Sequence, residues 1–69
     1  MECYIVESAT ETGRNVKYWS CTLDEWVTDI EEASKFNNEE LAQIWADDWQ
    51  DFYDVKGYGR YTNIAEVVL

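Results

Sequence analysis

The side chains of this sequence that could do chemistry are mostly carboxylates, and they are gathered in one part of the chain. Residues 24–54 hold eleven of the 15 acidic residues and a single base, Lys35, so this segment alone carries the net charge of −10. Such a one-sided negative field attracts basic partners and repels nucleic-acid phosphates and membrane surfaces. We therefore expect a partner-binding surface made of two sets of acids. The first set is Glu40, Asp47, Asp51 and Asp54, and the second set is Asp24, Asp29, Glu31 and Glu32.

Carboxylates that follow one another along a helix can imitate the phosphates of a nucleic acid. Acids one turn apart lie roughly 5–6 Å from each other, and Arg or Lys side chains pair with carboxylates as well as with phosphates. The expected partner is a basic host protein, such as a nucleic-acid-binding effector, and we expect no direct contact with nucleic acid. The alternative is that the acids only keep a small protein soluble.

Neither catalysis nor metal binding is indicated by the sequence. The chain has no His, which is the commonest metal ligand and a frequent general base, and it has no glycine-rich phosphate loop or nucleophile elbow. Cys3 and Cys21 lack a His partner and the spacing of zinc ligands. We expect no enzymatic activity, no metal and no cofactor.

The elements that must position these side chains begin with a β-hairpin. Residues 2–8 and 16–21 are rich in β-branched and aromatic residues, and a polar turn separates them. If Gly13 takes the left-handed position of a three-residue loop, Thr10 faces Arg14. The resulting register pairs Glu7 with Lys17, Ile5 with Trp19, and Cys3 with Cys21. Because no secretory signal is recognised, we expect the two cysteines to be reduced, half-buried thiols.

Two helix starts follow the hairpin. Thr28 precedes Glu31 by three residues, the spacing of a capping box, which predicts a short helical turn over residues 29–34. For the main helix, Asn37 is the expected N-cap, with Glu40 at the third helical position. Phe36 is expected to pack on Leu41, so that the helix begins at residue 38.

The main helix is expected to be amphipathic. At 100° per residue, its large apolar side chains fall within an arc of about 80° and are expected to face the core. These side chains are Leu41, Trp45, Trp49 and Phe52. The first set of acids lies on another face, where like charges one turn apart cost a few tenths of a kcal/mol per pair and oppose the helix macrodipole near its C-terminus. Gly57 and Gly59 are expected to end the helix before a final strand over residues 60–69.

Length and composition limit the architecture. A chain of 69 residues makes one domain, residues 1–69, and buries only about 60% of its unfolded surface, so large aromatic side chains must supply the core. The sequence predicts an α+β fold, with an antiparallel sheet of about three strands, one main helix packed on it and one short helical turn. No apolar run approaches the roughly 20 residues of a membrane span, so we expect a soluble, intracellular protein.

Residues 25–44, EWVTDIEEASKFNNEELAQI, carry a resemblance to a protein group. They resemble the W-x-x-D-I-x-x-A-x-x-F-x-x-x-E-x-A pattern of many small phage-encoded proteins. The residues at the motif positions are Trp26, Asp29, Ile30, Ala33, Phe36, Glu40, and Leu41 or Ala42. The resemblance covers under a third of the chain and implies a hairpin, a short turn, a helix and a closing strand. Some small acidic phage proteins that it resembles in size and charge are anti-defence inhibitors, including anti-CRISPR proteins, which occupy basic nucleic-acid channels.

Two functions follow from these features. The first is a phage-encoded, anti-CRISPR-like inhibitor that uses its acidic surface as a nucleic-acid mimic against a defence protein in the host cytoplasm. The second is a small structural or adaptor protein that self-associates through a sheet edge or an aromatic patch, with acids that serve solubility alone. The protein would be a monomer in the first case and a homodimer in the second.

Overall fold

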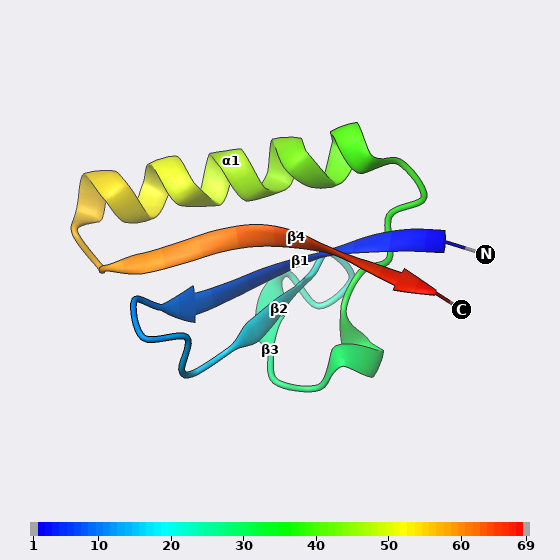
Figure 1. Cartoon of the computed structure of the whole chain (residues 1–69), viewed down its shortest axis with the longest axis horizontal. Helices are drawn as coiled ribbons and strands as arrows, with labels where there is room; N and C mark the ends of the chain where they lie inside the picture. Colours follow the sequence, from blue (N-terminus) through cyan, green and yellow to red (C-terminus); the bar gives the residue numbers. More distant parts are fainter. Residues whose placement is uncertain (1, 69) are drawn as a thin grey trace.

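The structure is a computed structural model that describes residues 2–68. One helix packs along strands β4 and β1 of a four-stranded antiparallel sheet with the strand order β3-β2-β1-β4 (Figure 1). The elements are β1 (Glu2–Thr10), β2 (Lys17–Ser20), β3 (Glu25–Val27), the 3-10 turn η1 (Ile30–Glu32), α1 (Glu39–Lys56) and β4 (Arg60–Val68). The predicted α+β class, main helix and short turn are confirmed, and the short strand β3 is added to the three expected strands.

The hairpin turn forms as predicted, but the register beyond it is shifted by one residue. Gly13 has a φ of +78°, and the Thr10 N–H donates to the Arg14 carbonyl over 2.9 Å. Glu7 then pairs with Tyr18, not with Lys17. Asn15 causes the shift, because its left-handed φ of +53° lets the second strand take up one extra residue as a bulge.

This shift moves Trp19 to the other face of the sheet from the predicted one. A change of register by one residue turns every side chain over, so Trp19 joins Val6 in the core beneath the helix instead of facing Ile5. The predicted pairing of Cys3 with Cys21 is wrong for the same reason. Cys3 is buried and Cys21 is exposed just after β2, and both are free thiols.

Helix α1 begins one residue later than predicted. Asn38 is the N-cap, and its side chain accepts hydrogen bonds from the N–H groups of Glu40 and Leu41 over 2.8 and 3.2 Å. The predicted cap at Asn37 is therefore wrong, and Leu41, on which Phe36 was expected to pack, is 44% exposed. Phe36 is fixed against β1 by two backbone hydrogen bonds with Tyr4 and lies in the core, which sets the entry of the chain into the helix.

The buried stripe of α1 is also rotated from the predicted one. Ala42, Ala46 and Tyr53 are buried, whereas Leu41 and Phe52 are 44% and 42% exposed. The rotation is roughly 80° at 100° per residue. The small alanine side chains let the helix approach the sheet closely. Trp45 and Trp49, which were predicted to face the core, do pack against it, but from the flank of the buried stripe.

The end of α1 and the final strand agree with the prediction over the described residues. Gly57 has a left-handed φ of +72°, and its N–H donates to the Tyr53 carbonyl over 2.8 Å. Strand β4 then pairs with β1 along its whole length and forms one edge of the sheet; position 69 lies outside the described residues. Polar contacts fix the helix on this strand, since Gln50 Oε1 accepts from the Thr62 N–H over 2.7 Å and the Thr62 hydroxyl donates to the Ala46 carbonyl over 2.6 Å.

Candidate protein-binding surface

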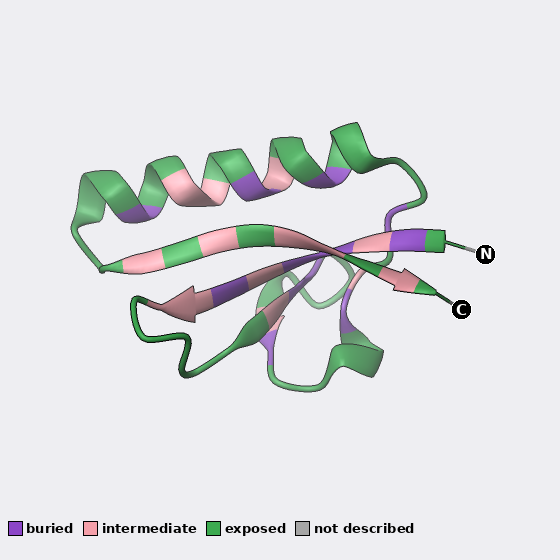
Figure 2. Cartoon of the chain, in the orientation of Figure 1, coloured by how far each residue is buried: buried purple, intermediate pink, exposed green. Residues whose placement is uncertain are grey.

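The first set of acids lies on one exposed side of α1, which we call the acidic helix face. Its members are Glu40, Asp47, Asp51 and Asp54, all of them exposed. Figure 2 shows the turns of α1 exposed on the side away from the strands and buried on the side toward them. The acids thus project from the outer side of the helix, as the sequence predicted.

Two members of the acidic helix face are held by neutral partners. Gln43 Nε2 donates to Asp47 Oδ1 over 2.9 Å, and Gln50 Nε2 donates to Asp54 Oδ1 over 3.0 Å. Each glutamine lies one turn before its acid, the spacing at which helical side chains meet. Amide donors orient the carboxylates without neutralising them, so their negative charge remains available to a partner.

The second set of acids does not join this face. Asp29 is the N-cap of η1, where its carboxylate accepts from the Glu31 N–H over 2.9 Å, in place of the expected cap Thr28. Glu31 and Glu32 are exposed in η1, and Figure 1 shows η1 and α1 with the strands between them. The eight predicted residues therefore form separate patches, not one surface.

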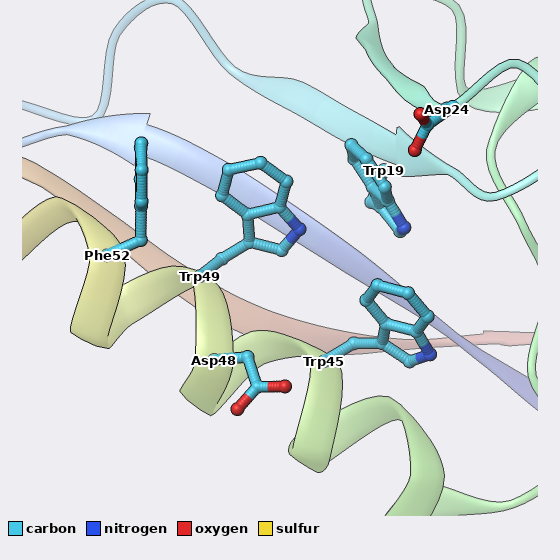
Figure 3. Close-up of a pocket in the computed structure, with 6 residues that line it drawn as sticks. All are labelled: Trp19, Asp24, Trp45, Asp48, Trp49 and Phe52. Atoms are coloured by element: carbon cyan, nitrogen blue, oxygen red, sulfur yellow. The ribbon is translucent and has the colours of Figure 1, made fainter.

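Asp24, the remaining predicted residue, lies at a groove between the helix and the β2–β3 turn. The groove has a volume of about 310 Å³ and is lined by Trp19, Asp24, Trp45, Asp48, Trp49 and Phe52 (Figure 3). Asp48 was not among the predicted site residues. Its spacing was a usable signal, because position 48 lies three residues after Trp45 and four before Phe52, on the same flank of the helix.

A cluster of tryptophans forms the wall of this groove. Trp19 is 4% exposed, and its ring centroid lies 5.8 Å from that of Trp45 and 4.9 Å from that of Trp49. Trp26 packs edge-on against Trp19 with centroids 5.5 Å apart. The buried indole N–H groups of Trp19 and Trp26 have no hydrogen-bond partner among residues 2–68, so the cluster is held by ring packing.

Another group of acids gathers where β1, β4 and the start of α1 meet. The neighbouring carboxylate of Glu2, together with burial, raises the pKa of Glu66 above its ordinary value, and Glu39 adds to the effect. Burial and the charge of Glu39 raise the pKa of Tyr4. Like charges thus repel one another at this end of the molecule.

Neither a metal-binding cluster nor a membrane-spanning helix is found among residues 2–68. They contain no group of three or more His, Cys, Asp or Glu side chains placed to hold a metal ion. No helix in this part of the chain has both the length and the apolar character needed to cross a membrane.

The chain was compared with known protein families, curated proteins and solved structures. No known family model, no curated protein and no solved structure matches the chain.

Proposed function

We propose that the protein binds a basic, nucleic-acid-binding surface of a host protein through its acidic helix face and thereby keeps nucleic acid away from that surface. The biological role that we propose is that of a phage-encoded, anti-CRISPR-like inhibitor of a host defence protein in the host cytoplasm. The partner would bind through Arg and Lys side chains that otherwise contact phosphates.

The observation that carries this proposal is the placement of four exposed carboxylates on the outer side of one helix. Like charges at this spacing destabilise a helix slightly, so helix stability alone does not account for them. A helix also keeps the carboxylates at fixed separations, which lowers the ordering cost of binding. The repeated spacing of the acids supports mimicry of a phosphate row.

The test compares a variant of this face with a control of equal charge. The triple variant Asp47→Asn, Asp51→Asn and Asp54→Asn removes three charges from the acidic helix face. The control variant removes three charges from outside residues 24–54, through Glu7→Gln, Glu11→Gln and Glu66→Gln. Both variants therefore have the same net charge, so a difference between them reports the position of the charges.

Each variant and the wild type serve as bait for proteins in a bacterial lysate, and the bound proteins are quantified. The proposal predicts a captured nucleic-acid-binding protein that the wild type and the control retain and the triple variant loses. If all three baits retained this protein equally, Asp47, Asp51 and Asp54 would be ruled out as its contacts.

The second function, self-association, is favoured by a different observation. Strand β4 forms an edge of the sheet. Gln50 of α1 bonds the backbone of this edge at Arg60 and Thr62, so pairing with another chain would use the part of β4 after Thr62. Light scattering of the purified protein tests this function. A stable dimer without a captured partner would favour the adaptor, whereas a monomer that captures a partner favours the inhibitor.

A further inference from the structure

The groove beside α1 is not part of the acidic helix face, and its lining has a different chemistry. Its walls combine the aromatic rings of Trp19, Trp45, Trp49 and Phe52 with the carboxylates of Asp24 and Asp48. Its volume of about 310 Å³ is at the lower end of the range for small-molecule pockets, which runs from about 300 to 1,000 Å³. The groove therefore suits one side chain better than a whole segment of a partner.

The aromatic rings favour a positively charged occupant. Trp45 and Trp49 are partly buried and Phe52 is exposed, so this row of three rings along α1 remains partly open to solvent. The face of an indole ring attracts cations within about 6 Å of its centroid. The chain's own Lys56 already uses one end of this row, since its Nζ lies 6.0 Å from the centroid of Phe52.

The two carboxylates come from different elements and flank the rings. Figure 3 shows Asp24 beside Trp19 on the strand side and Asp48 projecting from α1 beside Trp45 and Trp49. Asp24 holds a left-handed backbone with a φ of +52°, which few residues other than Gly, Asn and Asp adopt readily. Both carboxylates are exposed, so they can meet a charge that enters from solvent.

We propose that this groove binds the guanidinium group of an arginine side chain. A guanidinium is planar and weakly hydrated, stacks on aromatic faces and pairs with carboxylates through several N–H donors, whereas a lysine ammonium is a compact, strongly hydrated charge. Stacking on Trp45 and Trp49 and ion pairing with Asp24 and Asp48 use both parts of the lining. That the arginine belongs to the basic partner rests on the proposed function, but the binding itself is a property of the isolated protein.

The first test titrates the protein with N-acetyl-arginine amide and with N-acetyl-citrulline amide, which has nearly the same shape without the charge. Binding is followed through the tryptophan indole N–H signals in two-dimensional ¹H–¹⁵N correlation NMR spectra. The arginine compound is expected to shift the Trp45 and Trp49 signals saturably and to bind about tenfold more tightly than the citrulline compound. Equal binding of the two compounds, or no saturable shift, would overturn the proposal.

The second test separates the groove from the general negative charge of the protein. The variant Asp24→Asn with Asp48→Asn removes two charges at the groove, and Asn tolerates the left-handed backbone at position 24. The variant Asp51→Asn with Asp54→Asn removes two charges from the acidic helix face. The groove variant should bind the arginine compound about fivefold more weakly than the wild type, and the helix-face variant should bind it nearly as well as the wild type. If both variants lost the same amount of affinity for the arginine compound, the overall negative charge of the protein would account for the binding, and a groove site would be contradicted.

These results can be told apart from a failure of the proposed function. Arginine binding in the groove without a captured host partner would leave the groove site standing and remove the proposed function. Capture of a partner by the acidic helix face without arginine binding would remove the groove site alone.

Discussion

Arg60 joins the start of β4 to the hairpin through three hydrogen bonds. Its guanidinium donates to Ser8 Oγ over 3.0 Å, to the Ser8 carbonyl over 3.1 Å and to the Asn15 carbonyl over 2.7 Å. Ser8 is 1% exposed, so if the Arg60 side chain were removed, Ser8 would lose a hydrogen-bond donor that water cannot easily replace. We expect Arg60→Met to lower the free energy of unfolding by about 1–3 kcal/mol, measured by chemical denaturation.

Arg14→Met provides the control for this prediction, because Arg14 is exposed in the hairpin turn and removing it deletes the same charge. This control should change the free energy of unfolding by less than about 0.5 kcal/mol. Equal losses in the two variants would show that charge, not the contacts of Arg60, is responsible.

Glu66 gives a prediction about pH. Its pKa lies above the ordinary value of 4.5, mainly because of Glu2. A group whose pKa is raised by folding contributes stability that is complete below its unfolded pKa and is lost as the pH rises through its folded pKa. Glu66→Gln should therefore unfold at a higher temperature than the wild type at pH 7, and the two should converge below a pH of about 4.

Thermal unfolding of both proteins across this pH range measures the effect. Glu7→Gln serves as the background, since Glu7 lies farther along β1, opposite Asn63 of β4. An advantage of Glu66→Gln that persists unchanged at low pH would contradict repulsion by Glu2 as its cause.

At the scale of the element, α1 keeps its acids at a small cost to its own stability. Asp51 and Asp54 lie in the last two turns of a helix that ends at Lys56, where negative charge opposes the macrodipole. The triple variant Asp47→Asn, Asp51→Asn and Asp54→Asn should gain about 0.3–1 kcal/mol in unfolding free energy at low salt. Thermal unfolding should show that high salt reduces this gain by screening; a loss of stability at low salt would contradict the account.

The helix and hairpin also show what the sequence can predict and what it cannot. Periodicity and glycine placement predict the helix, its end at Gly57 and the outward direction of its acids. The register after the turn could not be predicted, because the bulge depends on the left-handed backbone of Asn15. The inward stripe was missed because large apolar residues suggest a core, whereas Ala42 and Ala46 allow the closest approach to the sheet.

At the scale of the whole molecule, the eight predicted acids could be located along the chain but not in space. Their grouping depends on the path of the chain through β3 and η1. This path leaves η1, which Asp29 caps, on the far side of the strands from α1, and it brings Asp24 to the groove with Asp48. The groove is a tertiary feature, since Trp19 reaches it from β2 and Trp45 from α1. Sequence patterns within a single helix or strand cannot predict which residues of different elements come into contact.

The most direct measurement of the central claim is competition for the captured partner. A labelled nucleic acid bound to that partner is titrated with the wild-type protein and with the triple variant at several salt concentrations. The account predicts that the wild type displaces the nucleic acid, that displacement weakens steeply as salt rises, and that the triple variant fails to displace it. A ternary complex of partner, nucleic acid and wild-type protein, or displacement that is independent of salt, would contradict it.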